Sequence, residues 1–142
     1  MKRILMAVAA TALIASPALA QDANEDDDGP VVRKDLSSAN AKIEGNAVTG
    51  ISAETDETVF LVLHDSAAGA PPASLGHATL QPGEYTNIRI DGTAPLDPAN
   101  GVYVMMHHDT NGNSEYDFGP GMTDVDGPVM EDGGAMTAPI SQ

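Results

Sequence analysis

The apolar residues of this chain fall into short runs that are separated by polar and turn-forming segments. Residues 58–65, TVFLVLHD, are apolar at most positions, and residues 101–106, GVYVMM, form a second run of the same kind. A short apolar run bounded by turn signals is typical of a strand that is buried on both faces. We therefore expect these two segments to be the central strands of a β-structure.

Weaker strand patterns occupy most of the remaining chain. Residues 84–90 alternate, with Tyr85, Asn87 and Arg89 on one side and isoleucines on the other, which predicts a half-exposed strand. Outside the first twenty residues no stretch has helical periodicity. About seven short strands separated by close turns indicate an all-β fold, an antiparallel β-sandwich. The expected strands are residues 46–53, 58–65, 74–79, 84–90, 101–106 and 135–140, with an ambiguous segment at 31–40.

The first forty residues have a different composition from the rest. Lys2 and Arg3 precede an apolar stretch that ends in SPALA-Q, the pattern of a secretory signal peptide cleaved after Ala20. Residues 21–40 begin with the acidic segment QDANEDDDGP, which lacks core-forming residues and predicts a largely disordered leader. We expect the domains to be 1–20, 21–40 and 41–142, in a periplasmic or secreted protein with no membrane span after cleavage.

The negative charge of the chain excludes anionic partners. The chain has 6 basic and 21 acidic residues, a formal charge of −15; without Lys2 and Arg3 the balance is 4 against 21, or −17. A surface of this sign repels nucleic acid and anionic lipid. The chain has no Cys, so disulfides do not contribute to its stability.

Four segments in a fixed order resemble one family. They are TVFLVLHDS, LQPGEYTNIRI, VYVMMHHDTNGNSEYDFG and DGP. Together they resemble the secreted domain of unknown function numbered 7282, which is common in haloarchaeal and some bacterial surface proteins. The resemblance covers about residues 41–140 and implies an immunoglobulin-like sandwich in an exported protein, with no established activity. On the family pattern H-x-D-T-N-G-N-x-x-Y-D-F, the family His is His107 and the Asp is Asp109; His64 and Asp65 form the earlier His-Asp pair.

A polar, oxygen-rich loop follows the second central strand. Asp109, Asn111 and Asn113 match the first three ligand positions of a D-x-[DN]-x-[DN] calcium loop, and Asp117 offers a further carboxylate. Ca²⁺ is the cofactor that this spacing suggests.

The spacing nevertheless departs from an EF-hand. Ser114 replaces the sixth-position Gly, and Pro120 replaces the bidentate Glu at the twelfth position. Two interpretations stay open. One is a calcium loop of another geometry that uses Asp124 or Asp126. The other is an Asx-rich turn in which the side chains cap their own backbone.

The histidines suggest a second type of metal site. His64 and His107 end the two central strands, and His108 is adjacent, so these three side chains could bind copper or zinc together with nearby methionines. We favour the alternative that histidine–carboxylate hydrogen bonds hold the loops in place, with Asp65 as one such carboxylate.

No catalytic pattern is present. The chain lacks a G-x-S-x-G sequence and a phosphate-binding glycine loop with Lys. We therefore expect a non-enzymatic, monomeric domain with a structural or binding role in the cell envelope, where its partner is unspecified and calcium modulates the loop. The alternative is a histidine-dependent periplasmic carrier or sensor of copper or zinc.

Overall fold

The computed structural model describes residues 34–66 and 73–141, so the expected signal peptide and the acidic segment before residue 34 lie outside the described residues. The described part forms ten β-strands and one 3₁₀-helix, η1 (Pro98–Asn100). It contains no helix with the length and hydropathy needed to cross a bilayer. The fold is all-β, as the strand patterns predict.

One sheet is built around the long strand β3 (Ala47–Thr55). On one side β3 pairs with β1 (Asp35–Ser37) and β2 (Lys42–Glu44), and on the other side it pairs with β6 (Gly83–Asp91), all antiparallel. Because β1 precedes Ala41 and is hydrogen-bonded to β3, the sandwich includes residues ahead of the expected boundary.

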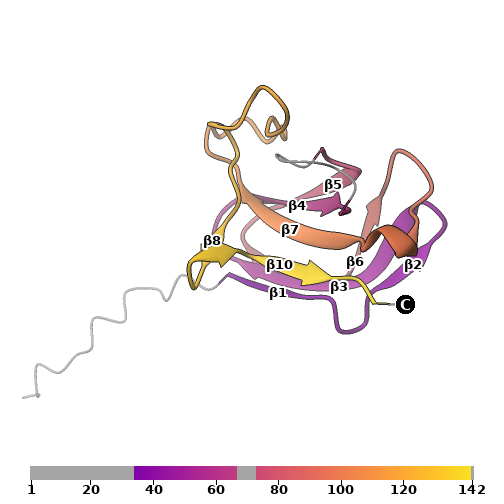
Figure 1. The fold of residues 1–142 in the computed structure, drawn as a ribbon. Coiled ribbons are helices and arrows are strands. Elements are labelled where there is room, and N and C mark those ends of the chain that lie inside the picture. The colour runs from indigo at the N-terminus through magenta and orange to yellow at the C-terminus, as the bar shows by residue number, and fades with distance from the viewer. Residues whose placement is uncertain (1–33, 67–72, 142) are drawn as a thin grey trace, which may run out of the picture. The chain divides into compact units, whose positions relative to one another are not determined.

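The second sheet contains the two strands that the apolar runs predict to be central. Its order is β10 (Thr137–Pro139), β7 (Tyr103–His108), β4 (Val59–His64) and β5 (Gly76–Leu80), and every pairing is antiparallel. Figure 1 shows the two sheets, with the hairpin of β8 (Met130–Glu131) and β9 (Gly134–Ala135) between the long loop and β10.

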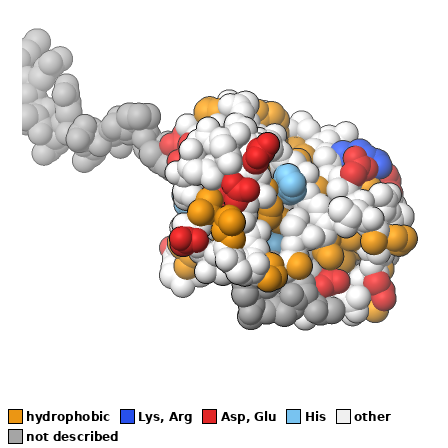
Figure 2. All heavy atoms as spheres, turned by 90° about the horizontal axis from the view of Figure 1, so that it is seen from above, with side chains coloured by type: hydrophobic (Ala, Val, Ile, Leu, Met, Phe, Trp, Pro, Cys, Tyr) orange, Lys and Arg blue, Asp and Glu red, His pale blue; other side chains and the backbone are white. Residues whose placement is uncertain are grey.

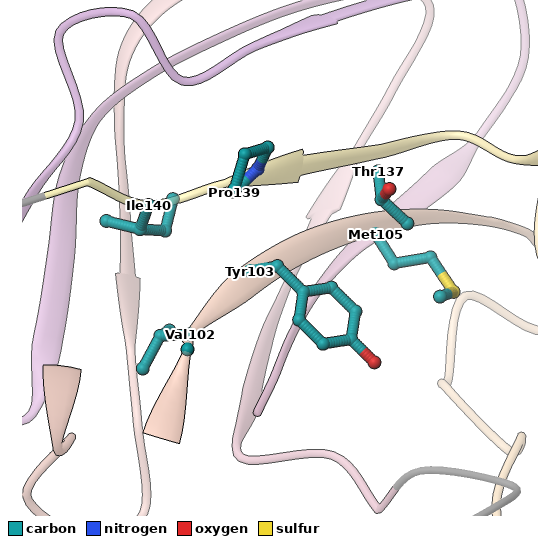
Figure 3. Close-up of a pocket in the computed structure, with 7 residues that line it drawn as sticks. Val102, Tyr103, Met105, Thr137, Pro139 and Ile140 are labelled. Atoms are coloured by element: carbon teal, nitrogen blue, oxygen red, sulfur yellow. The ribbon is translucent and has the colours of Figure 1, made fainter. Parts of the chain in front are cut away.

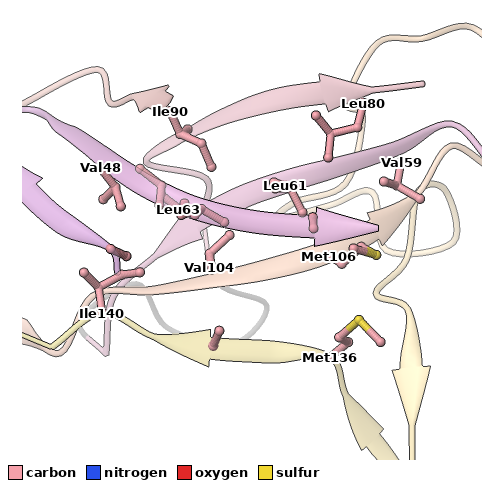
Figure 4. Close-up of a cluster of buried hydrophobic side chains, with 14 of the residues drawn as sticks. Val48, Val59, Leu61, Leu63, Leu80, Ile90, Val104, Met106, Met136 and Ile140 are labelled. Carbon is pink, nitrogen blue, oxygen red and sulfur yellow. The ribbon is translucent and has the colours of Figure 1, made fainter. Parts of the chain in front are cut away.

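The main hydrophobic core lies between the two sheets. Alternate residues of β4 and β7, including Leu61 and Val104, have no exposed surface, which confirms the expectation for these two residues. They belong to one cluster with Val48, Ile51 and Ile90 of the β3–β6 sheet (Figure 4). This packing makes the domain a β-sandwich.

The expected alternation of β6 is wrong because the β3–β6 ladder contains two irregularities. Ile51 pairs with Ile88 and Ala53 with Tyr85, so β6 carries one extra residue between these pairs. Between these pairs β6 has two residues, Thr86 and Asn87, where β3 has only one. Asn87 has φ 55°, the left-handed conformation that a bulge uses. The bulge moves Tyr85 to the core side with Ile88 instead of leaving it beside Asn87.

Strand β4 is buried on both faces. Phe60, Val62 and His64 point away from the main core, yet each has no exposed surface. The long connection 109–127 between β7 and β8 lies on this side of the sheet, above β4 and β7 in Figure 1. The outer face of this sheet therefore carries a second, smaller core.

Candidate functional site

The second core is a cluster of aromatic and histidine rings. Tyr116 and Phe118 of the connection 109–127 lie with ring centres 5.1 and 5.0 Å from the ring of His107. Tyr116 also contacts Phe60 of β4 at 5.5 Å. These two aromatic residues anchor an otherwise polar loop on the sheet.

Two buried histidines meet inside this cluster. His64 ends β4 and His107 is the penultimate residue of β7; both have no exposed surface, and their ring centres are 5.7 Å apart. Tyr103 packs on the other side of His64, at 5.5 Å. In the strand register His64 is opposite Tyr103 and His107 is opposite Phe60, so the two histidines are not directly paired. Their side chains nevertheless meet on the outer face of the sheet.

Each of these histidines binds a loop backbone through Nδ1. Nδ1 of His64 is 2.9 Å from the carbonyl oxygen of Ala73, and Nδ1 of His107 is 2.7 Å from that of Asp126. The sequence suggested carboxylate partners, whereas the structure uses main-chain carbonyls. A histidine at the end of each central strand thus holds a main-chain carbonyl, of Ala73 or of Asp126, against the sheet.

Burial keeps both rings neutral. Desolvation lowers the pKa of His107 to about 4, although its hydrogen bond to the Asp126 carbonyl acts in the opposite direction. Desolvation also lowers the pKa of His64, against the raising effects of the Ala73 carbonyl and of the Asp65 charge. At neutral pH the two imidazoles therefore carry no charge.

The remaining two histidines do not join this pair. His108 points to the opposite side of β7, where its Nδ1 meets the carboxylate of Glu57. His77 is exposed on β5 at the rim of the ring cluster, with its ring centre 5.3 Å from that of Tyr116. The structure therefore brings together His64 and His107 but not His108. Within residues 34–66 and 73–141, no group of three or more His, Asp or Glu side chains is arranged to hold a metal ion.

Asp126 organises the base of the polar loop. It is fully buried, and its Oδ1 accepts from the N–H of Thr110 at 2.9 Å while its Oδ2 accepts from the N–H of Asp117 at 2.9 Å. Its own N–H donates to Thr110 Oγ1 at 2.8 Å. One buried carboxylate thus ties the start, the middle and the end of the loop together.

The Asp and Asn side chains of the loop accept hydrogen bonds from the loop's own backbone and pair with one another. Asp109 Oδ2 accepts from the N–H of Ser114 at 3.0 Å, and Asn111 Oδ1 accepts from the N–H of Asn113 at 3.1 Å. The side-chain amides of Asn111 and Asn113 both donate to Asp117 Oδ2, at 3.0 and 2.9 Å. The four residues of the expected calcium loop are therefore gathered in one group and form the capped turn of the other interpretation.

Four buried polar atoms in the described part of the chain have no hydrogen-bond partner. They are Nε2 of His64, Nε2 of His107, Oδ1 of Asp109 and the hydroxyl of Tyr116. All four belong to the ring cluster or to the loop above it. Such atoms are rare in folded proteins and call for an explanation, such as a bound water or ion.

The sequence analysis missed the roles of Tyr116 and Phe118. Two aromatic residues inside a loop of Asp, Asn and Gly are the signal that could have found them, because large apolar rings in a polar segment need a surface to pack on. Of the acidic residues expected to shape the loop, Asp126 is buried at its base, Asp124 is exposed, and Asp65 is partly buried next to His64.

A shallow pocket lies at the β7–β10 edge of the same sheet. Tyr103 and Met105 of β7 line it on one side of the strand, and Thr137 and Pro139 of β10 complete it (Figure 3). Figure 2, which looks down on the face that carries the loop, shows acidic and apolar side chains interspersed, with basic side chains only near the rim.

Comparison with known proteins finds a matching family model and similar sequences in two cell surface glycoproteins. A family model described as a domain of unknown function (DUF7282) matches residues 34–141. Cell surface glycoprotein 2 of Haloarcula hispanica is 33% identical over 120 residues, which are 82% of this chain and 12% of the glycoprotein. Cell surface glycoprotein 1 of the same organism is 32% identical, with the same coverage. The chain thus spans about 12% of the length of these relatives. No solved structure matches it significantly.

Proposed function

Because the chain belongs to the family described as a domain of unknown function (DUF7282), we propose that it is a structural, non-catalytic domain of the cell envelope. The observation that carries this proposal is the similarity of 82% of the chain to cell surface glycoproteins. The strongly acidic sequence and the export signal expected at residues 1–20 support a location outside the cytoplasm.

The second core explains how such a domain tolerates an exposed environment without disulfides. The loop 109–127 covers the outer face of β4 and β7 with Tyr116 and Phe118, so the sheet buries apolar surface on both sides. Burial of additional apolar area is a direct source of stability for a small domain. We infer that this packing, and not catalysis, is the purpose of the His and Tyr rings at the loop base.

Cell fractionation tests the location. We expect a C-terminally tagged full-length chain to be recovered from the periplasm, the cell surface or the medium, with an intact mass that starts at Gln21. Recovery of the full-length chain in the cytoplasm, with Met1 retained, would contradict the proposal.

We further propose that Ca²⁺ orders the loop. Asp109 Oδ1 is buried and has no hydrogen-bond partner in the described part of the chain. Asn111 and Asn113 each carry a side-chain oxygen in the same turn, which accepts from a loop N–H, and Asp117 carries a further carboxylate. A cation at Asp109 would satisfy this oxygen and reduce the repulsion between the two carboxylates. The missing twelfth-position Glu predicts weak affinity, roughly 10⁻⁴ to 10⁻³ M, in the class of extracellular modules.

Thermal melting tests the calcium proposal separately from the location. We expect millimolar Ca²⁺ to raise the melting temperature, Mg²⁺ to act weakly because it demands a tighter octahedral shell, and Asp109→Ala to remove the effect. Glu84→Ala is the matched control, since Glu84 is an exposed acidic residue on β6, outside the loop. A calcium shift no larger than that of NaCl at equal ionic strength, or one that survives Asp109→Ala, would refute calcium binding at this loop.

A further inference from the structure

The hydrogen bonds of His64 and His107 fix the protonation of both rings. A carbonyl oxygen only accepts, so Nδ1 of each ring, which lies against a carbonyl of Ala73 or Asp126, must carry the proton. A neutral imidazole has one N–H, and Nε2 of each ring is then a bare lone pair.

Among the described residues, neither of these buried lone pairs has a hydrogen-bond partner. His64 and His107 have no exposed surface, and Nε2 of each ring meets no hydrogen-bond donor in the described part of the chain. A buried acceptor that lacks a partner costs about 1–3 kcal/mol, and here two such atoms occur in adjacent rings. A species that accepts electron pairs from both nitrogens would remove both penalties at once.

The ring spacing matches a shared metal ion. Two imidazoles bound to one metal through Nε2, at bond lengths of about 2.0–2.1 Å, have ring centres roughly 5 to 6.5 Å apart for angles between tetrahedral and linear. The ring centres of His64 and His107 are 5.7 Å apart. The Nδ1–H···O=C bonds are also the arrangement by which metal-binding histidines are usually oriented.

The surroundings select the kind of ion. Within the described residues no third His, Asp or Glu completes a ligand group, and the neighbours of the pair are the rings of Tyr103, Tyr116 and Phe118. A divalent ion such as Zn²⁺ takes three or four protein ligands, and the described residues supply only two here. Met105 lies on the same side of β7 as Tyr103 (Figure 3), two residues before His107, and its thioether is a soft group of the kind that suits monovalent copper.

We propose that His64 and His107 bind one Cu(I) ion through their Nε2 atoms beneath the loop 109–127. This site is separate from the calcium proposal, which rests on Asp109 and the Asn residues above it. It gives the domain a copper-binding capacity in addition to its structural role.

Competition with a colorimetric Cu(I) chelator, under anaerobic reducing conditions, tests the site on the mature chain. The ion is supplied both to the folded protein and during refolding, because the rings are buried. We expect one Cu(I) per chain in the wild type, and an affinity lower by on the order of a hundredfold or more in His64→Gln and His107→Gln. The controls His77→Gln and His108→Gln are expected to bind as the wild type does.

A spectroscopic measurement on the wild type covers the case in which a variant fails to fold. Ag(I), a redox-inert substitute for Cu(I), is expected to shift the ¹⁵N resonances of Nε2 of His64 and His107 while their Nδ1 atoms remain protonated. Wild-type protein that retains no Cu(I) against the chelator, or Nε2 resonances that Ag(I) leaves unchanged, would overturn the proposal; a water molecule would then be the partner of the two nitrogens. Retention by both histidine variants would overturn it as well.

Discussion

Thr110 and Asp126 hold each other through reciprocal hydrogen bonds across the base of the loop. The N–H of Thr110 donates to Asp126 Oδ1 at 2.9 Å, and the N–H of Asp126 donates to Thr110 Oγ1 at 2.8 Å. The same Asp126 presents its carbonyl oxygen to His107. Asp126 therefore connects two parts of the loop with each other and connects the loop with the sheet. Substitution of its side chain tests how much these connections stabilise the loop.

Asp126→Ala is expected to lower the free energy of unfolding by about 2–4 kcal/mol, because the N–H groups of Thr110 and Asp117 lose a charged, buried acceptor. Urea denaturation measures the loss, and hydrogen exchange is expected to accelerate at these two amides. Asp124→Ala, at an exposed position of the same loop, is expected to change stability by less than about 0.5 kcal/mol. Equal stabilities of the two variants would show that Asp126 does not organise the loop.

Leu61→Ala is expected to cost about 2–5 kcal/mol, because Leu61 is fully buried in the main core between the sheets. Thr79→Ala, at an exposed position on the neighbouring strand β5, serves as the control. A melting temperature that is the same for both variants would contradict the placement of β4 in the core.

Gly76→Ala is expected to be destabilising for a purely steric reason. A Cβ atom at Gly76 would lie 2.3 Å from the carbonyl oxygen of Asp91, which is backbone and cannot move aside easily. We expect a loss of about 1–3 kcal/mol or more by thermal or urea denaturation. Gly127→Ala is the matched control, because nothing lies within 4 Å of its Cβ position. Tolerance of Gly76→Ala would mean that the start of β5 lies farther from the end of β6 than the structure has it.

Acid is expected to destabilise the metal-free protein below about pH 6.5. The pKa of His107 falls from 6.5 in the unfolded chain to about 4 in the folded state. Between these values the unfolded state binds the extra proton, so the free energy of unfolding decreases as the pH is lowered. His64 contributes in the same direction. For His107 alone the full loss is roughly 2–4 kcal/mol.

Urea denaturation between pH 7.5 and 4, with a chelator present, measures this dependence. Carboxylates also titrate toward the acid end of the range, so the comparison with His107→Gln isolates the histidine contribution. The variant is expected to have a flatter profile between pH 6.5 and 5. A profile as steep as that of the wild type would show that His107 is not buried in its neutral form.

The central strands were predictable because their composition reflects a single property, burial on both faces of the sheet. Val59 to Leu63 are apolar at consecutive positions, and only burial on both faces suits such a run. The bulge at Asn87 was not predictable from β6 alone. A bulge is defined by the pairing of two strands: β6 has one residue more than β3 between two paired positions, and the sequence of β6 alone does not reveal this.

The polar residues of the loop could be located from the sequence, but neither the roles of Tyr116 and Phe118 nor the arrangement of the side chains could be. The spacing Asp109, Asn111, Asn113 marks the loop, and the structure gathers these side chains in one group. The meeting of His64 with His107 depends on the register of β4 and β7, and a strand pattern does not encode register between segments so far apart in sequence. For the same reason the separation of His108 from this pair could not be foreseen as long as its strand was expected to end at Met106.

The directions of the two outermost strands bear on how the domain responds to a pulling force. β1 and β10 run side by side in the same direction along one edge of the sandwich (Figure 1), and Ser38 Oγ donates to the carbonyl oxygen of Pro139 at 2.6 Å. The chain therefore enters and leaves this domain at opposite ends of neighbouring strands. Tension between these ends would shear the β1–β3 and β10–β7 ladders and load their hydrogen bonds together, instead of opening them one by one. Under tension between these ends, the domain would extend only at the rate of its forced unfolding.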